Sequence, residues 1–257
     1  MMQALSGQAF LRIWEVGLGQ HALDRALTML GIACPDMTRD TFARLSIGQR
    51  DTCLLALREL TFGSHIVGVA SCPQCQERLE FALDCREMQL IAKANALLTN
   101  KQVVAKATQQ VQTLHIEGYE VQVHLPNSLD LAALVSSHTI ADARQVLMQR
   151  CIVHAAQPDG AVVVVDALPE MVITTLAEQM AENDPQAEIE LELECTVCRH
   201  RWQLLFDIVE FFWLEITAQA KRLLREVHTL ARAYSWRETD ILAMSPARRH
   251  MYLEMVM

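Results

Sequence analysis

The chain has 257 residues, of which 51% are apolar, and its formal net charge is −9. This length and composition allow a large buried core and predict one or two domains. The negative charge argues against duplex nucleic acid or an anionic membrane as the main partner, because both attract a positive surface. The first residues do not form a basic and then apolar signal, and no apolar run is long enough to span a bilayer, so we expect a cytoplasmic protein.

The charge is unevenly distributed along the chain. Residues 166–194 contain nine acidic residues and no Lys or Arg, whereas the C-terminal region is basic. Such an asymmetry suits docking to several neighbouring proteins, although two solvated faces of opposite sign produce the same pattern. The basic residues are Lys221, Arg222, Arg225, Arg232, Arg237, Arg248 and Arg249.

Two Cys-x-x-Cys motifs are the most conspicuous chemistry of the chain. They contain Cys72 and Cys75, and Cys195 and Cys198. Each motif is followed at the same offsets by Arg, by three apolar residues at alternate positions and by Asp, and Ile66 and Ile189 stand at equivalent places upstream. This internal repeat predicts two strand–knuckle–strand units, over residues 64–84 and 187–207. Because thiols stay reduced in the cytoplasm, the motif cysteines are interpreted as metal ligands rather than disulfide partners.

Four thiolates around one ion form the tetrahedral site of structural zinc. We therefore predict one structural Zn²⁺ per chain, held by the four motif cysteines between paired strands of the two halves, with His200 as a reserve ligand. Because 119 residues separate the motifs, two unrelated cysteine pairs in the core are the alternative. Gln76 and Arg199 stand where such turns often have glycine, which would fit a degenerate site. The remaining cysteines, Cys34, Cys53, Cys85 and Cys151, are predicted to be small core residues.

Helical spacing dominates the regions around the repeat. Residues 1–63 are predicted to form a helical region, in which Gly31 and Pro35 separate two leucine-rich helices. Residues 85–186 are predicted to form a mainly helical insertion, with helices over 87–112 and 168–182 and two more over 129–155, divided near Ser136-Ser137. Within it, the alternation around Gly118 in residues 115–125 predicts a hairpin, and residues 161–165 a short buried strand or extended segment.

The strongest helical pattern covers residues 207–233 and opens a C-terminal region of residues 208–257. Its apolar residues recur at spacings of four and three, as in a coiled-coil-like contact, which either covers its own domain or binds a partner. Ser235 with Glu238 predicts a capping box for a short helix, and Ser245 before Pro246 predicts the start of a last helix. The repeating residues are Val209, Trp213, Ile216, Ala220, Leu223, Val227, Leu230 and Tyr234.

The sequence contains no recognisable catalytic constellation. A phosphate-binding glycine loop, a His-Glu-x-x-His motif and a nucleophile elbow are all missing. A zinc ion with four cysteine ligands has no position for a substrate water. The alternating glutamates of residues 188–194 are typical of the solvated face of a strand. We therefore predict that the protein is not an enzyme.

An ordered string of residues runs through the second cysteine motif and the last helices. It consists of the motif at 195–198, Trp202, Phe206-Asp207-Ile208, Glu215, residues 223–228, Leu230-Ala231, Tyr234-Ser235-Trp236, Glu238, Asp240-Ile241-Leu242, Arg248-Arg249 and Tyr252-Leu253-Glu254. Together these residues resemble the baseplate hub assembly proteins of T-even type, which occur with contractile phage tails and related injection systems. The best-matched stretch covers about the last seventy residues, whereas the first motif and residues 57–63 fit less specifically.

The resemblance implies a non-enzymatic protein that assembles, or forms part of, the hub of a contractile tail, with other baseplate or hub proteins as partners. The fold predicted is α+β: mostly helical, with a small zinc ribbon split by the insertion, and a long C-terminal helix followed by two short ones. A zinc ribbon that binds nucleic acid and a zinc enzyme with an open coordination position are the alternatives. The predicted interface residues are Trp213, Leu223, Val227, Leu230, Tyr234, Trp236, Arg248, Arg249 and Tyr252.

Overall fold

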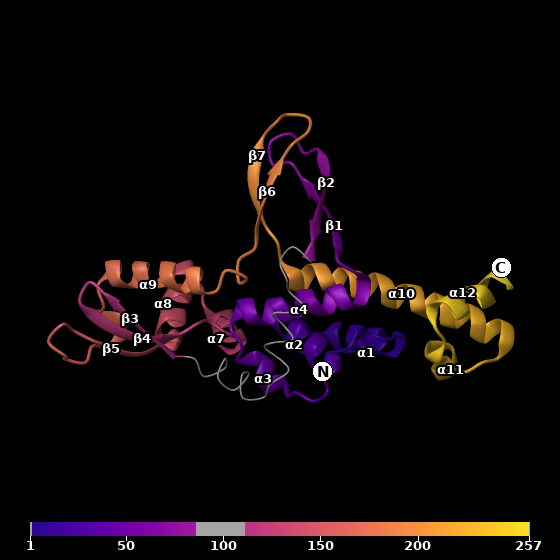
Figure 1. Ribbon diagram of the computed structural model, residues 1–257, viewed down its shortest axis with the longest axis horizontal. Helices are drawn as coiled ribbons and strands as arrows, with labels where there is room; N and C mark the ends of the chain where they lie inside the picture. Colours follow the sequence, from indigo (N-terminus) through magenta and orange to yellow (C-terminus); the bar gives the residue numbers. More distant parts are fainter. Residues whose placement is uncertain (1, 86–110, 257) are drawn as a thin grey trace.

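The computed structural model describes residues 2–85 and 111–256. Figure 1 shows a central group of helices, an insertion at one end, two hairpins that stand out side by side from the centre, and a long helix that leads to the C-terminal helices at the other end. Helices dominate the described residues, and the strands form small sheets of two or three. The predicted α+β fold class is therefore confirmed.

The central group consists of the N-terminal helices. They are α1 (Gly7–Gly17), α2 (Ala22–Ala33), α3 (Arg39–Ala43) and α4 (Ile47–Phe62). Helix α4 begins with a capping box formed by Ser46 and Gln49, and it ends at Gly63, whose φ of 92° suits glycine. Because α4 lies between α2 and the long helix α10, nearly all its residues up to Arg58 are buried.

The two halves of the internal repeat form two separate hairpins. Strand β1 (His65–Ser71) pairs with β2 (Arg78–Asp84), and β6 (Glu190–Glu194) pairs with β7 (Arg201–Leu205). Each pair is a two-stranded sheet of its own, so the expectation that strands of the two halves pair with each other is wrong. The halves meet through side chains at their bases and through the cysteines at their tips.

The insertion packs three strands against helices. The sheet has the order β3 (Val111–Ile116), β4 (Tyr119–His124) and β5 (Ile152–Ala156). The predicted hairpin is confirmed, and its turn places Glu117 and Gly118 at φ values of 51° and 83°. The helical elements are α7 (Ser128–Ala133), the 3₁₀ turns η2 (Leu134–Ser136) and η3 (Val165–Ala167), α8 (Ile140–Cys151) and α9 (Glu170–Asn183).

The predicted division of residues 129–155 into two helices near Ser136-Ser137 is confirmed, because α7 and η2 end at Ser136 and α8 begins at Ile140. The C-terminal bound of the second helix is wrong: α8 ends at Cys151, and the following five residues form β5 because β-branched Ile152 and Val153 suit the edge of a sheet. Of the two alternatives for residues 161–165, the extended segment holds and the buried strand does not: the segment makes one isolated bridge, from Ala156 to Val162, and the Val162 side chain is exposed. Of the helix predicted over 87–112, residues 86–110 lie outside the described residues, and Val111 and Gln112 belong to β3.

A buried polar junction joins the insertion to the central helices. Asp184, which follows α9, accepts hydrogen bonds from Ser46 Oγ at 3.0 Å and from the Gly48 backbone N–H at 2.9 Å. A Cβ atom at position 48 would lie 2.2 Å from Asp184 Oδ1, so only glycine fits there. Beside them, Arg50 donates to Asp51 at 2.7 Å and to Ser128 of α7 at 3.2 Å. The carboxylate of Asp184 therefore caps α4.

The C-terminal region consists of α10 (Ile208–Tyr234), α11 (Glu238–Ala243) and α12 (Pro246–Glu254), as predicted. Asp207 caps α10 by accepting from two backbone N–H groups, and Ser245 caps α12. The capping box predicted for Ser235 and Glu238 is wrong. Ser235 instead ends α10 in the left-handed conformation, with a φ of 57°, and Arg237 precedes α11 without a side-chain cap.

Three clusters of buried apolar side chains stabilise the described chain. The largest joins α1, α2, α4 and the first half of α10 to the bases of both hairpins. The second lies inside the insertion, and the third joins the end of α10 to α11 and α12. None of the helices in the described ranges 2–85 and 111–256 is long and apolar enough to cross a membrane.

Candidate metal centre

Each Cys-x-x-Cys motif forms the turn of its hairpin, and the two turns have the same backbone bonds. In the first, the Cys72 N–H donates to Glu77 O at 2.8 Å and the Gln76 N–H donates to Cys72 O at 2.9 Å. In the second, the Cys195 N–H donates to His200 O at 2.9 Å and the Arg199 N–H donates to Cys195 O at 3.0 Å. The repeat in sequence is therefore a repeat in structure.

The residue after the second cysteine of each motif is left-handed. Gln76 has a φ of 62° and Arg199 a φ of 61°. A residue with a Cβ atom costs about 1 kcal/mol in this region, which is why glycine often stands there. From the sequence, the absence of glycine at these positions suggested a degenerate site. Both turns nevertheless form with Gln76 and Arg199 there.

The four motif sulfurs converge at the tips of the hairpins. Cys72 Sγ lies 3.6 Å from Cys198 Sγ, and Cys75 Sγ lies 3.5 Å from Cys195 Sγ. All four sulfurs lie within 4.8 Å of one another. A tetrahedron of sulfurs at about 2.3 Å from a zinc ion has edges of about 3.8 Å, so the cluster fits one ion of this size. The closest approaches join one half of the repeat to the other, which excludes two unrelated pairs in the core.

Backbone groups favour a thiolate at this cluster. The Cys198 N–H donates to Cys195 Sγ at 3.5 Å and lowers the pKa of the Cys195 thiol to about 7. For Cys75, the Glu77 N–H acts in the same direction, but desolvation and the neighbouring thiols outweigh it and raise the pKa to about 12. Four thiols so close together cannot all ionise without a cation, and a divalent ion with soft-ligand affinity would remove that repulsion. The chemistry of the donor set therefore fits zinc.

The base of the first hairpin is fixed to the long helix by an ion pair between buried Arg58 and partly buried Glu215. Arg58 of α4 donates to both carboxylate oxygens of Glu215 in α10, at 3.0 and 2.7 Å. The same guanidinium donates to the carbonyl oxygens of Gly63 and His65, both at 2.7 Å. One side chain thus holds α4, the start of β1 and α10 together at the base of the first hairpin.

His200 does not belong to the sulfur cluster. Its ring lies parallel to that of Trp202, with centroids 6.1 Å apart.

Desolvation raises the pKa of Cys34 to about 11 and that of Cys151 to about 12, and it also raises the pKa values of Cys53 and Cys85. All four of these cysteines are buried, as small core residues are.

A second group of potential ligands lies in the insertion, where His124, Asp130 and Cys151 come within 4.8 Å of one another. Their polar atoms are already engaged. Both ring nitrogens of His124 face backbone carbonyl oxygens, of Leu125 at 3.0 Å and of Arg150 at 2.9 Å, and Asp130 accepts from the Arg150 side chain at 2.9 Å. Sequence reasoning missed this group because its members belong to three different elements. It ties β4, α7 and α8 together.

The predicted interface residues fall into two sets. Trp213, Leu223, Val227, Leu230 and Arg249 are buried within the chain, and Arg249 donates to Glu226 at 3.0 Å and to Met244 O at 2.8 Å. Arg248 is exposed, and three half-buried aromatic rings pack together beside it. Those rings belong to Tyr234, Trp236 and Tyr252, with centroids 4.4 to 5.8 Å apart. Only the second set lies where a partner can contact it directly.

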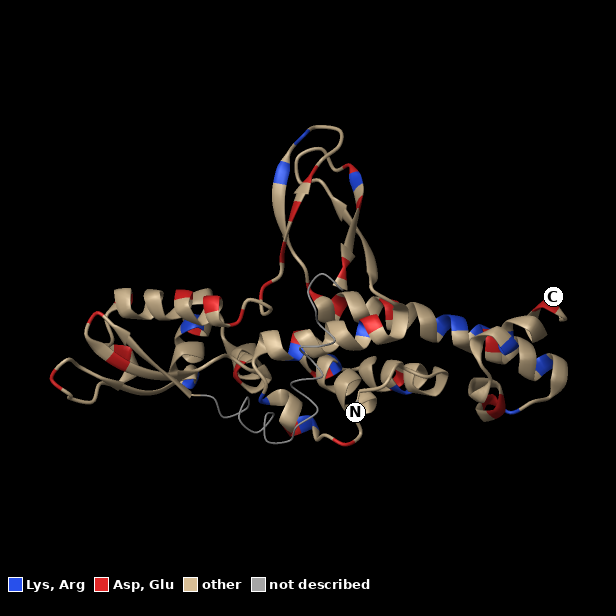
Figure 2. Cartoon of the chain, viewed as in Figure 1, with Lys and Arg blue, Asp and Glu red and all other residues tan. Residues whose placement is uncertain are grey.

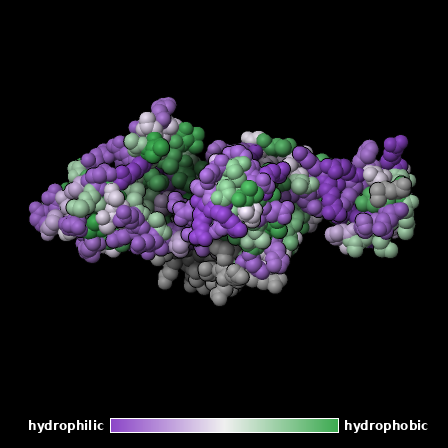
Figure 3. All heavy atoms as spheres, turned by 90° about the horizontal axis from the view of Figure 1, so that it is seen from above, coloured by the Kyte–Doolittle hydropathy of each residue, from purple (hydrophilic) through white to green (hydrophobic). Residues whose placement is uncertain are grey.

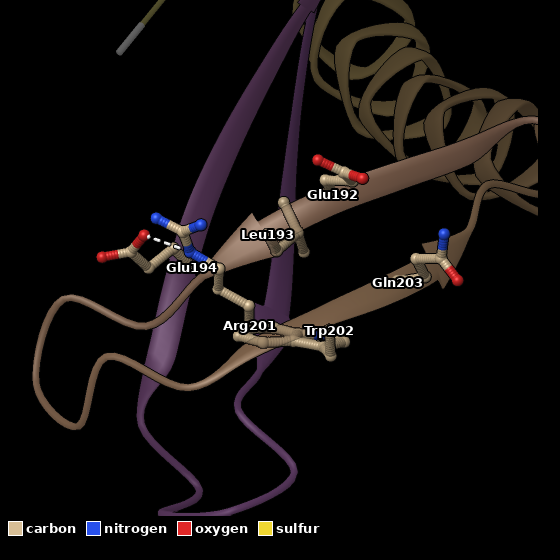
Figure 4. A pocket seen from close by; sticks show the side chains of 6 residues that line it. All are labelled: Glu192, Leu193, Glu194, Arg201, Trp202 and Gln203. Carbon is tan, nitrogen blue, oxygen red and sulfur yellow. Dashed lines mark hydrogen bonds and ion pairs between the residues drawn. The ribbon is translucent and has the colours of Figure 1, made fainter.

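A shallow hollow lies beside the second hairpin. Figure 4 shows its lining residues, which come from β6 and β7 and form three cross-strand pairs. Glu194 accepts from Arg201 at 2.8 Å, and Leu193 stands opposite Trp202. No nucleophile or histidine lines this hollow, and its single ion pair is exposed. The lining residues are Glu192, Leu193, Glu194, Arg201, Trp202 and Gln203.

Comparison with known proteins gives one finding. The family model described as T4 bacteriophage base plate protein matches residues 20–213. That span includes α2 to α4, both hairpins and the whole insertion, and it ends near the start of α10. It therefore differs from the C-terminal stretch on which the resemblance in sequence depends. No curated protein and no solved structure matches the chain.

Proposed function

Because the chain belongs to the T4 bacteriophage base plate protein family, we propose that it is a non-enzymatic component or assembly factor of a contractile-tail baseplate, folded around one structural zinc ion. The observation that carries the proposal is the convergence of the four motif cysteines, inside the span that matches the family. The metal links two segments that the insertion separates. It supplies stability and leaves no position for catalysis.

The zinc ion would act as a clasp. Each hairpin is only two strands wide, and such a sheet is marginal in water unless it packs on something else. The bases of the hairpins pack on the largest core, through Ile66, Phe81 and Leu191 among others. Among the described residues, the tips meet at the sulfur cluster and at a long contact of 3.9 Å between Cys198 Sγ and Gln74 Oε1. Zinc bound there would keep both hairpins upright as one projection.

Partner contacts are proposed at the C-terminal end of the molecule. The aromatic cluster of Tyr234, Trp236 and Tyr252 is half-buried and lies beside exposed Arg248. Aromatic and arginine side chains are enriched in protein interfaces because they combine a large apolar area with polar groups. A nucleic-acid partner is not favoured, because the exposed side of β6 is a row of glutamates.

Co-expression with the other baseplate and hub proteins of the same particle, followed by affinity capture, tests the function. We expect at least one of them to be captured by the wild-type protein. The variant Trp236→Ala/Arg248→Ala should lose that partner, whereas the matched variant Trp202→Ala/Arg199→Ala, on the second hairpin, should retain it. If a folded wild-type protein captures no baseplate or hub protein, the proposed function is wrong.

A further inference from the structure

The exposed side of α10 carries basic residues that have no partner in the described chain. Lys221, Arg225 and Arg232 stand at intervals of four and seven residues, on the side opposite the buried residues of this helix. No described carboxylate pairs with any of these three side chains, whereas the neighbouring Arg222 donates to Glu226 at 2.9 Å. Figure 2 shows this basic stripe as blue on α10 between the hairpins and the C-terminal helices, and the same segment is hydrophilic in Figure 3.

The exposed side of the second hairpin carries the opposite charge. Glu190 and Glu192 alternate with Leu191 along β6, and Glu188 precedes them. No described basic group pairs with these three glutamates, whereas the next one, Glu194, accepts from both Arg199 and Arg201. This acidic row also borders Leu205, which stands opposite Glu190 in β7 and is 61% exposed.

The two surfaces are held apart within one chain. Helix α10 starts directly after β7, so Lys221 lies about 20 Å along the helix from the base of the hairpin. The hairpins stand away from the helix, as Figure 1 shows, and Ile189, Leu191 and Phe206 hold the base of the second hairpin against the largest core. The acidic row therefore cannot turn onto the basic stripe of its own chain.

We propose that the acidic row of one copy binds the basic stripe of α10 in a second copy of this chain. The two sets match in number, and their overall lengths are similar: Glu188 to Glu192 extends about 13 Å along the strand, and Lys221 to Arg232 about 16 Å along α10. An exposed leucine accompanies each set, Leu205 beside the acidic row and Leu214 on α10. Because each copy carries a net charge of −9, contacts that bring two acidic surfaces together are repulsive, whereas this orientation pairs an acidic with a basic surface.

Such a contact uses two different surfaces, one from each copy. An open assembly then retains one free acidic row at one end and one free basic stripe at the other, so copies add in a line until a ring closes or a filament forms. Because charged side chains dominate the contact, the association should weaken strongly with ionic strength. The inference goes beyond the proposed function, since it needs neither a baseplate partner nor a particular metal.

Sedimentation velocity of the purified full chain tests the inference. At about 0.05 M salt we expect association that rises with protein concentration and is lost at about 0.5 M salt. The basic-stripe variant Lys221→Glu/Arg225→Glu and the acidic-row variant Glu190→Lys/Glu192→Lys should each associate at least about tenfold more weakly. Mixing these two variants in equal amounts should restore association, because the reversed surfaces complement each other.

A matched control separates position from total charge. Arg12→Glu/Arg44→Glu changes the net charge by the same amount as the basic-stripe variant, at exposed residues in α1 and at the end of α3, outside both surfaces. It should associate as the wild type does. The inference is overturned by a wild-type protein that stays monomeric at low salt, by association that survives either reversal, by a mixture that stays monomeric, or by equal loss in the control.

Discussion

The two hairpins have the same backbone and different exposed sides. Both present two cysteines, a left-handed residue and an alternating inner side, in equivalent positions. Outward, however, the first carries Val67 and Val69, which are 59% and 52% exposed, and the second carries glutamates. On the inner sides, packing against the shared core requires apolar residues in both hairpins. On the outer sides no such packing limits the residue type, so each hairpin can contact a different partner.

The inner sides also differ in how they fill the same space. At equivalent positions the first hairpin has Gly68 and Phe81, and the second has Leu191 and Leu204. Gly68 stands opposite Phe81, and a Cβ atom on it would lie 2.2 Å from the ring. One hairpin therefore pairs the smallest residue with a large one, and the other pairs two of intermediate size.

The largest effect is expected where the two hairpins are equivalent. Cys72→Ser and Cys195→Ser should each abolish stoichiometric zinc and lower the free energy of unfolding by several kcal/mol, because metal binding and folding are coupled. The two variants should be equal within error, since each half supplies two ligands. Metal analysis and thermal unfolding would measure this.

The controls for the cysteine variants are Gln74→Ala and Thr196→Ala, at exposed positions within the same two turns. Both should retain one zinc ion per chain. Two ions per wild-type chain, or none in freshly purified protein, would contradict the shared site.

A second test uses Asp51, which lies near the end of the second hairpin. Burial raises its pKa to about 6 despite Arg50, and Asp207 and Asp184 add to the rise. Between about pH 4 and 6 the folded state thus binds more protons than the unfolded state, so stability falls as pH rises through this range. Relative to Asp51→Asn, the wild type should lose about 2 kcal/mol of unfolding free energy from pH 4 to 7.

Urea unfolding of both proteins at each pH measures this difference, because groups common to both proteins cancel. Asp207→Asn should reduce the pH-dependent loss, since it removes one of the charges that raise the pKa of Asp51. If the difference in unfolding free energy between the wild type and Asp51→Asn stays constant with pH, the raised pKa of Asp51 is wrong.

A third test exchanges the packing of one hairpin for that of the other. Gly68→Leu should cost about 2 kcal/mol, because the new side chain overlaps the Phe81 ring. Adding Phe81→Leu recreates the leucine pair of the second hairpin and should recover most of the loss. Chemical denaturation measures the free energy of unfolding of both variants. If adding Phe81→Leu does not recover the stability lost in Gly68→Leu, the packing of the two hairpins is not interchangeable.

The smallest effect is expected at the end of the second hairpin. Asp207→Ala should cost about 1 kcal/mol, because Asp207 accepts from the Val209 and Glu210 N–H groups and caps α10. Asp207→Ser should retain most of the stability, since serine also caps helices. Equal losses in both variants, measured by thermal unfolding, would contradict the capping role.

The sequence predicts this fold best where a pattern repeats. The equivalent positions around the cysteines predict both hairpins, and the alternating spacing from Val209 to Tyr234 predicts α10. Where two patterns overlap, prediction fails: Ile152 continues the apolar spacing of α8, although the chain has already become a strand. The capping box predicted at Ser235 is wrong for another reason. The left-handed conformation of Ser235 depends on how α10 ends against the third cluster, which the local sequence does not show.

The convergence of the four motif cysteines was predictable from the sequence, but the surroundings of the cluster were not. The four cysteines follow from the two motifs, whereas the tie from Arg58 to Glu215 joins residues 157 positions apart that no local pattern connects. The seam of α10 shows the same limit. Its spacing predicts that Leu223 and Leu230 are covered, and only the structure shows that their own chain covers them.

The split arrangement of the cysteines also has a consequence in time. Ribosomes add about 5 to 20 residues per second, so the second pair follows the first by about 6 to 24 s. During this interval the first hairpin has two cysteines and no complete site, and the insertion, with a core of its own, can fold undisturbed. Tetrahedral coordination of one ion becomes possible only after Cys198 has emerged. A metal site built from all four cysteines can therefore be completed only late in synthesis, after the insertion that separates its halves.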